Sequence, residues 1–350
     1  MKILNMCIFS DPRTQGGIQT FGRTMKKFYP KELRSLTVVN SSKKIYKVSN
    51  LIEVGSNNFF FRIVNKLLKN KLKEYLIKKE VKKCNWDAII FSFPYELEIL
   101  KYIKAKKIMV QHFNIEKFIK IAKSVPELSD LIKELNWFIV LSPYDKEKFQ
   151  KKFDISEKKI RIIRHTCNIE IIRGKKEKNK KLIMIARIDN HQKRFDLAIR
   201  AMKKLSEFTL EIYGDGPDIE KCENIIKNES IKNVFLRGST NKVQEKLDES
   251  GIFIMTSDFE GYPISTIEAM RRGLPLIVRN TYEAAQDIVI DNGVLLEKEW
   301  DEDKFIEAVR EVYDNYEYYS ENSKKLGERH SPEVIKKEWD KLLEGIDNGK

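Results

Sequence analysis

Short apolar runs alternate with longer amphipathic segments along the whole chain. Strands are expected over residues 3–9, 36–39, 88–91, 107–110, 138–141 and 160–163, and again over residues 182–185, 210–213, 234–236, 252–255 and 275–278. Helices are expected between them, among others over residues 196–205, 243–249, 264–272 and 303–313. Regular alternation of strands and helices predicts an α/β protein whose parallel sheets carry helices on both faces.

A charged stretch at residues 173–181 separates the two series of strands. A chain of 350 residues is longer than a domain with one hydrophobic core usually is. The second series of strands therefore predicts two domains, residues 1–172 and 173–330. Residues 331–350 are expected to form a further helix, with Ser331 as its N-cap and Pro332 at its first position. Open α/β sheets bind ligands at the carboxyl ends of their strands, so two such sheets facing each other would bind a ligand in a cleft.

The composition narrows the cellular setting. The chain contains no run of about 18 apolar residues, so no membrane-spanning helix is expected. The first apolar run begins directly after Met1 and Lys2, which leaves no room for a signal peptide. The four cysteines and four histidines are widely spaced, which favours reduced thiols and argues against a zinc cluster. We therefore expect a cytoplasmic protein without a metal site.

The net charge of +14 is unevenly divided, with +18 over residues 1–170 and −4 over residues 171–350. A basic first half predicts an anionic partner, such as lipid head groups, a phosphorylated acceptor or nucleic acid. Within the basic segment 59–83, five apolar residues can share one helix face flanked by lysines: Leu67, Leu68, Leu72, Leu76 and Ile77. Such a helix either lies in the interface of an anionic membrane or packs on the core with a solvated basic side.

The most informative motif is a pair of glutamates, Glu260 and Glu268, around the start of a predicted helix. A strand precedes the pair, Gly261 begins a turn, and the N–H groups of Ile264, Ser265 and Thr266 open the helix. Free N–H groups at a helix N-terminus bind phosphate, and a carboxylate accepts hydrogen bonds from vicinal hydroxyls. The pattern therefore predicts a pocket for a phosphorylated, hydroxyl-rich ligand. Taken alone, both glutamates also fit a solvated surface.

Basic and glycine-rich segments follow other predicted strands. Arg187 and Lys193 come after the strand at 182–185, where two cations could clamp a diphosphate and stabilise the charge of a leaving group without a metal. Gly214 opens a Gly-Asp-Gly-Pro turn after the strand at 210–213, and Gly16 with Gly17 follows the first strand. Each of these signals alone is weak, because surface cations and structural turns are common.

In their order along the chain, these motifs resemble the retaining glycosyltransferases of family 4, which have the GT-B fold. The resemblance covers nearly the whole chain and rests on the glycine loop, the basic pair, the Gly-Asp-Gly-Pro turn and the Glu-x7-Glu motif. It implies two Rossmann-like domains, with the final helix crossing back to the first. It also implies that Arg187 and Lys193 hold the donor diphosphate, that Glu268 holds the ribose and that Glu260 holds the donor sugar.

The resemblance further assigns a histidine of the first domain to the donor sugar. His112 matches that position, and His165 is a weaker rival. Gly238, Ser239 and Thr240 mark the expected loop at the nucleotide base. Two positions depart from the family: Arg194 stands where a glycine usually follows the lysine, and Pro263 lacks an N–H that could meet phosphate.

The expected function is transfer of a hexosyl or N-acetylhexosaminyl group, with retention and without a metal or other cofactor. The donor would be a nucleoside diphosphate sugar, with UDP favoured. The acceptor would be a glycan or lipid-linked glycan of bacterial cell-envelope, capsule or teichoic-acid-type synthesis, reached at the inner face of the membrane. Alternatives are an epimerase or hydrolase of nucleotide sugars, or a nonspecific nucleic-acid-binding protein, although no specific nucleic-acid motif is present. The oligomeric state is not predicted.

Overall fold

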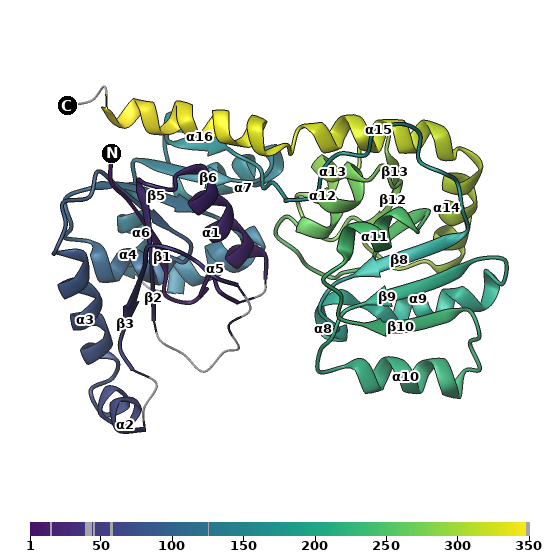
Figure 1. The fold of residues 1–350 in the computed structure, drawn as a ribbon, viewed down its shortest axis with the longest axis horizontal. Coiled ribbons are helices and arrows are strands. Elements are labelled where there is room, and N and C mark those ends of the chain that lie inside the picture. Colours follow the sequence, from purple (N-terminus) through teal and green to yellow (C-terminus); the bar gives the residue numbers. More distant parts are fainter. Residues whose placement is uncertain (15, 39–43, 45, 57–58, 125, 348–350) are drawn as a thin grey trace. The chain divides into compact units, whose positions relative to one another are not determined.

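The computed structural model describes residues 1–14, 16–38, 44, 46–56, 59–124 and 126–347. The chain divides into two compact units, Met1–His165 with Lys336–Lys350, and Thr166–Ile335. The sequence pattern places these divisions a few residues away, after residues 172 and 330. Each unit contains one parallel β-sheet with helices on both faces (Figure 1).

Within the described residues, the sheet of the first unit has seven parallel strands in the order β3-β2-β1-β4-β5-β6-β7. Their bounds are β1 Ile3–Cys7, β2 Leu33–Val38, β3 Leu51–Val54, β4 Ala88–Phe91, β5 Lys106–Val110, β6 Trp137–Val140 and β7 Ile160–Ile162. The central strands β1 and β4 are buried at every position, as expected for strands covered by helices on both faces. Strand β3 was not predicted, because it is a four-residue edge strand that is mostly exposed or half-buried.

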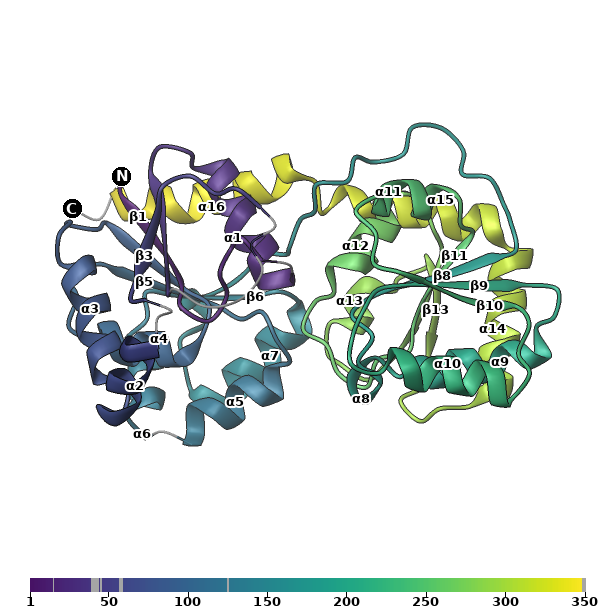
Figure 2. The same cartoon turned by 60° about the horizontal axis from the view of Figure 1, so that its bottom comes forward.

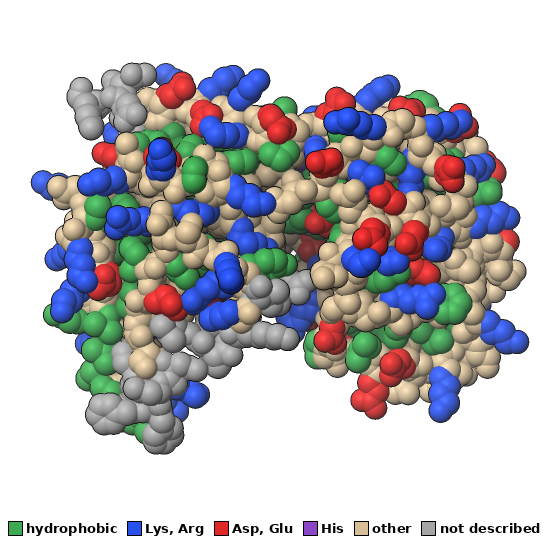
Figure 3. Space-filling model, viewed as in Figure 1, with side chains coloured by type: hydrophobic (Ala, Val, Ile, Leu, Met, Phe, Trp, Pro, Cys, Tyr) green, Lys and Arg blue, Asp and Glu red, His purple; other side chains and the backbone are tan. Residues whose placement is uncertain are grey.

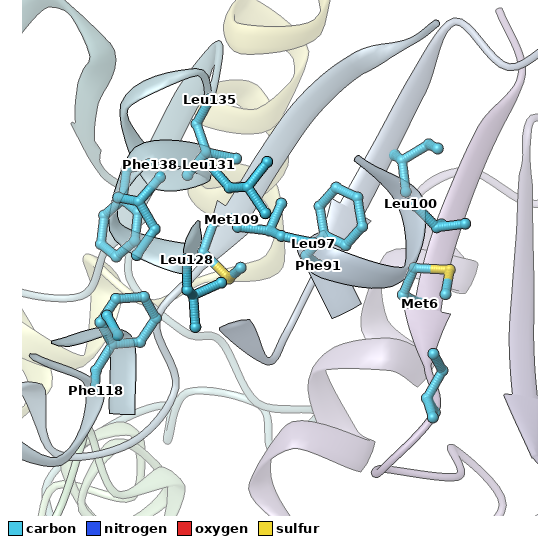
Figure 4. Packing of buried hydrophobic residues seen from close by; sticks show 14 of the residues in the cluster. Met6, Phe91, Leu97, Leu100, Met109, Phe118, Leu128, Leu131, Leu135 and Phe138 are labelled. Atoms are coloured by element: carbon cyan, nitrogen blue, oxygen red, sulfur yellow. The ribbon is translucent and has the colours of Figure 1, made fainter. Parts of the chain in front are cut away.

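The helices of this unit are α1 Gly17–Phe28, α2 Phe59–Leu67, α3 Lys71–Val81, α4 Pro94–Leu100, α5 Ile115–Ser124, α6 Pro126–Lys133, α7 Pro143–Phe153 and the short η1 Glu157–Lys159. Figure 4 shows the core between the sheet and one helical layer, where Phe91 lies beside Leu97, and Phe118 lies farther along the same cluster, near Phe138. From Lys336 onward, helix α16 (Pro332–Asp347) belongs to this unit: Asp340 accepts a hydrogen bond from the Tyr29 hydroxyl (2.8 Å).

The predicted amphipathic face over residues 67–77 is wrong in one respect. Lys69 and Asn70 have positive φ angles of 47° and 67°, so the helix ends and a second one begins. Leu67 and Leu68 are therefore exposed at the end of α2, whereas Ile77 is fully buried on α3. The residues cannot share one continuous helix face. Val39 and the side chains of residues 59–61 lie outside the described residues.

The sheet of the second unit has the order β10-β9-β8-β11-β12-β13, again parallel throughout the described residues. Its strands are β8 Lys181–Ile185, β9 Thr209–Tyr213, β10 Val234–Gly238, β11 Ile252–Met255, β12 Leu276–Arg279 and β13 Gly293–Leu296. Its helices are α8 Asn190–Lys193, α9 Phe195–Ala201, η2 Met202–Lys204, α10 Ile219–Asn228, α11 Val243–Asp248, α12 Ile264–Arg271, α13 Ala285–Ile288, α14 Glu302–Asp314 and α15 Tyr316–Glu328. Figure 2 shows α9 and α10 on one face of this sheet and α11, α12 and α15 on the other.

The strand order of the second unit determines where its motifs meet. Strand β8 lies between β9 and β11, so the connections run in opposite directions on its two sides. Such a reversal opens a crevice at the carboxyl ends of the strands, where ligands of open α/β sheets bind. The segments 186–193, 214–217 and 256–263 all leave the sheet at this edge, because they follow β8, β9 and β11.

Candidate functional site

Lys193 and Glu260 are brought together at this edge. The Lys193 Nζ lies 2.5 Å from the Glu260 Oε1, and the Glu260 residue is only 8% exposed. Ser257 Oγ donates to the same oxygen (2.7 Å), and Gln192 Nε2 donates to Oε2 (3.2 Å). A cation and an anion this close and this far from water stabilise each other's charge.

Two polar partners of this pair were not predicted from the sequence. Gln192 precedes Lys193 directly, and it also donates to the Phe259 carbonyl oxygen (3.0 Å). Ser257 lies three residues before Glu260 and two residues after the end of β11. Both residues flank a predicted site residue at a strand end, which is the signal that could have identified them.

The turn after β8 positions the basic pair. The Asp189 side chain caps α8 by accepting from the Gln192 N–H (3.4 Å), and the Lys193 N–H donates to the Asp189 carbonyl oxygen (2.7 Å). Arg187 precedes this turn and is exposed. Among the described residues, its guanidinium has no hydrogen bond or ion pair. Arg187 therefore offers a cation that a diphosphate could engage without breaking an existing contact.

Glu268 lies on the second turn of α12 in a different environment from Glu260. Burial raises the pKa of its carboxyl to about 7. At the start of the same helix, the Thr266 N–H already donates to the Pro263 carbonyl oxygen (3.3 Å). The first helical residues, Ile264 and Ser265, carry N–H groups that an α-helix leaves without intrahelical acceptors, so these two suit an anion best.

Gly214 and Gly216 hold the chain against the Arg187 segment. A Cβ atom at Gly214 would lie 1.8 Å from the Ala186 carbonyl oxygen, and one at Gly216 would lie 2.2 Å from the Ile188 carbonyl oxygen. Backbone hydrogen bonds fix the same approach, from the Ala186 N–H to Tyr213 (3.1 Å) and from the Ile188 N–H to Asp215 (3.0 Å). These glycines therefore shape the site by backbone packing.

The turn at Gly261–Pro263 is held in place by the side chain of Tyr262, which was not predicted as a site residue. Its hydroxyl lies 3.1 Å from Asp287 Oδ2 and 3.2 Å from His330 Nε2, and all three residues are almost fully buried. Gly261 itself is half-buried. The buried hydrogen bonds hold the turn that connects Glu260 to α12.

Arg194 stands where the resemblance implies a glycine, and its backbone takes a conformation that suits glycine. Its φ and ψ angles are 51° and 44°, in the left-handed region. This conformation costs a non-glycine residue about 1–2 kcal/mol. Ion pairs of the Arg194 guanidinium with Asp196 and Asp258 offset that cost.

The two candidate histidines of the first unit are neighbours. His112 follows β5, His165 follows β7, and His112 Nδ1 lies 3.4 Å from His165 Nε2. Burial lowers the pKa of both imidazoles, that of His165 to about 4, so both rings are neutral at pH 7. Within the part of the chain that the structure describes, the buried His112 Nε2 has no hydrogen-bond partner. The two residues form one pair, although the sequence suggested them as rivals.

The remaining predicted residues lie in loops at strand or helix ends. Gly16 is the N-cap of α1 with a φ of 144°, and exposed Gly17 begins that helix. Gly238 ends β10 with a φ of 71°, followed by exposed Ser239 and half-buried Thr240. The described residues contain no group of three or more His, Cys, Asp or Glu side chains that could hold a metal ion. Among them, no helix is both long and apolar enough to cross a membrane.

Comparisons with known proteins point in one direction. Residues 168–330 match the family model described as glycosyl transferases group 1. The poly(glycerol-phosphate) alpha-glucosyltransferase of Bacillus subtilis (strain 168) is 29% identical over 153 residues, which is 42% of this chain and 22% of that enzyme. An uncharacterized glycosyltransferase of Haemophilus influenzae is 24% identical over 341 residues, which is 88% of this chain and 94% of that protein.

A solved structure shares the fold over nearly the full length. A point mutant of S. aureus TarM, in complex with fondaparinux, alpha-GlcNAc-glycerol and UDP, superposes with a TM-score of 0.74 at 17% identity, covering 98% of this chain and 99% of that chain. The two parallel sheets found in the units therefore belong to a GT-B fold. Residues 168–330, which lie within the second unit, are therefore similar to the group 1 glycosyltransferases.

Proposed function

We propose that this chain transfers a sugar, with retention, from a nucleoside diphosphate sugar to a glycan or lipid-linked glycan of the bacterial cell envelope. The observation that carries the proposal is the Lys193–Glu260 ion pair at the carboxyl ends of β8 and β11. The TarM complex contains UDP, which supports a UDP-sugar as donor. The Bacillus subtilis relative is named for glucosylation of poly(glycerol-phosphate), which supports an envelope polymer as acceptor.

The proposed roles follow from the charges of the site. Arg187, Lys193 and the first N–H groups of α12 would hold the donor diphosphate. Once a phosphate oxygen takes over the Lys193 ammonium, the Glu260 carboxylate is free to accept hydrogen bonds from hydroxyls of the donor sugar. Glu268 would accept hydrogen bonds from the ribose diol.

The reaction would break the bond between the sugar C1 and the diphosphate oxygen and form a bond from C1 to the acceptor oxygen on the same face. The acceptor proton would pass to the departing diphosphate. Positive charge at Arg187 and Lys193 stabilises the negative charge that grows on the leaving group, and such preorganised charge is usually the largest contribution of an active site. The proposed chemistry relies on no metal ion.

An anionic membrane surface is the proposed partner of helices α2 and α3. Residues 59–83 hold nine Lys or Arg against two Glu, a net charge of +7. Ile63, Leu67, Leu68 and Tyr75 are 41%, 76%, 47% and 60% exposed. Hydrophobic side chains with blue basic neighbours gather over α3 in Figure 3. Apolar side chains among lysines suit the interface of an anionic leaflet, where each cation contributes about 1 kcal/mol.

One experiment separates transfer from the alternatives. The protein is incubated with a panel of UDP-, GDP- and dTDP-sugars, with and without membrane glycolipid extract, and the products are identified by mass spectrometry and by the anomeric coupling in NMR spectra. Transfer requires product only with acceptor and an anomeric configuration equal to that of the donor. A changed nucleotide sugar without acceptor would indicate an epimerase, free sugar would indicate a hydrolase, and an inverted product would overturn the retaining mechanism.

The membrane proposal has its own test. Sedimentation with phosphatidylglycerol vesicles should capture the protein at low salt and lose it at high salt, whereas phosphatidylcholine vesicles should not. Replacing Leu67 and Leu68 by Ser should weaken capture, and replacing exposed Val334 of α16 by Ser should not. Absence of capture at any salt concentration would refute the proposal.

A further inference from the structure

Arg194, Asp258 and Arg279 form a charged chain beside the Lys193–Glu260 pair. We propose that this chain is a positioning network, which holds the segment that carries Lys193 against the segment that carries Glu260. The inference rests on the roles proposed above for Lys193 and Glu260. None of its three members belongs to the basic pair or to the Glu-x7-Glu motif.

The carboxylate of Asp258 lies between two guanidinium groups. Arg194 Nη1 lies 3.2 Å from its Oδ2, and Arg279 Nη1 lies 2.6 Å from its Oδ1. Arg194 also contacts Asp196 with two nitrogens, Nε (3.1 Å) and Nη2 (3.2 Å). Its planar fork therefore bridges two carboxylates that come from different parts of the chain.

Arg279 provides the fixed end of the network. It closes strand β12 and is only 6% exposed. Besides Asp258, it donates to the Thr256 carbonyl oxygen (2.9 Å) and to the Lys298 carbonyl oxygen (2.7 Å). Because the sheet holds Arg279, Asp258 is held as well, two residues before Glu260.

Further hydrogen bonds to backbone carbonyl oxygens join the same two segments. The Asp258 N–H donates to the Gln192 carbonyl oxygen (2.8 Å). The Thr256 hydroxyl lies 3.1 Å from the Lys193 carbonyl oxygen and 2.9 Å from that of Arg194. A displacement of Arg194 relative to Asp258 would therefore move the backbone that carries Lys193 relative to Glu260.

The backbone conformation of Arg194 independently supports the positioning role of the network. Its φ of 51° is unfavourable for any side chain with a Cβ and is neutral for glycine. A strained conformation persists where the surroundings enforce it, and such strain is concentrated at functional sites. Arginine at position 194 tolerates a strained backbone conformation, and in that conformation its guanidinium reaches Asp258.

The test compares Arg194→Gly, Asp258→Asn and their double mutant in a sugar-transfer assay run well below the melting temperature. Arg194→Gly suits the backbone, so the fold should survive. Each single change is expected to lower kcat about tenfold or more with little change in the acceptor KM, and the double mutant should lose no more than the worse single mutant. Arg194→Lys should restore part of kcat. Arg200→Gln is the matched control, because Arg200 also pairs with Asp196 but does not reach Asp258, and it should stay within twofold of wild type.

Amide hydrogen exchange of the same variants tests the positioning role without an activity assay. Amides in residues 189–196 and 256–260 should exchange faster in Arg194→Gly and Asp258→Asn than in wild type or Arg200→Gln. If the wild type transfers no sugar, the proposed function fails while the exchange data still test the network. Additive losses of kcat, full activity in Arg194→Gly, or unchanged exchange in both segments would each overturn the positioning role.

Discussion

The protonation of Glu268 should control donor binding in a direction that can be measured. Its carboxyl has a pKa of about 7 in the folded protein because burial disfavours the charged form. A neutral carboxyl accepts hydrogen bonds from the two ribose hydroxyls less well than a carboxylate. If the donor requires the ionised form, the apparent Kd equals the intrinsic Kd divided by the ionised fraction.

That fraction is about 0.1 at pH 6 and about 0.9 at pH 8 for a pKa of about 7, so the Kd for a UDP-sugar should fall about tenfold between these values. Titration calorimetry with a UDP-sugar is the suitable assay, because its esterified diphosphate does not titrate in this range. Glu268→Gln should bind with a Kd that does not change with pH, and at both pH values it should bind more weakly than the wild type does at pH 6, where about a tenth of Glu268 is still ionised.

The same substitution should have the opposite effect on stability. Because the folded pKa of about 7 lies above the usual 4.5, the proton stabilises the folded state, and stability is lost as pH rises from 4.5 to 7. This loss amounts to about 3 kcal/mol, from 1.36 kcal/mol per pKa unit. Urea unfolding should therefore find Glu268→Gln equal to wild type near pH 4.5 and more stable at pH 8. Parallel binding curves for the two proteins, or the same stability difference at both pH values, would refute the reasoning.

Three further substitutions test separate parts of the site. Lys193→Ala should lower kcat about 10²–10³-fold, because no ammonium group would then stabilise the leaving diphosphate and Glu260 would lose its ion-pair partner. Steady-state transfer kinetics measure this loss. Gly214→Ala should destabilise the second unit by about 2–4 kcal/mol, because its Cβ would meet a backbone oxygen at 1.8 Å; thermal unfolding measures the loss, and a shift below 1 °C would contradict it. Tyr262→Phe should cost about 1–3 kcal/mol by leaving the buried Asp287 without its hydroxyl partner, which urea unfolding would show.

The fold could be predicted where burial is uniform. Strands at 88–91 and 252–255 have the predicted bounds, because a central parallel strand covered on both faces is a continuous apolar run with polar ends. Edge strand β3 and the break between α2 and α3 at residues 68–70 were not predicted, because neither has a clear signal in the sequence pattern. An edge strand needs little hydrophobicity, and the left-handed conformation of Lys69 and Asn70 has no signal as clear as glycine.

The candidate site could be predicted residue by residue but not pair by pair. Position after a strand is a weak signal alone, and the order of the motifs along the chain strengthens it enough to nominate Lys193, Glu260 and the Gly214 turn. Their meeting at one edge follows because parallel strands end at the same edge of the sheet. Contacts across the sheet depend on strand order, which the local pattern does not contain. Strand β8 lies beside β11 although 66 residues separate the end of one from the start of the other, and only that neighbour relation brings Lys193 to Glu260.

The two glutamates show why this difference matters for chemistry. Within the sequence motif they are equivalent carboxylates, and either could serve as a charged ligand. In the structure, Glu260 faces an ammonium group at 2.5 Å, whereas the environment of Glu268 raises its pKa to about 7 by burial. Groups of one type that are placed in unlike environments take unlike roles. In the proposed mechanism, Glu260 becomes free for hydroxyls of the donor sugar once the diphosphate has taken over its partner Lys193. A carboxyl at Glu268 that ionises near neutral pH would make nucleotide binding depend on pH.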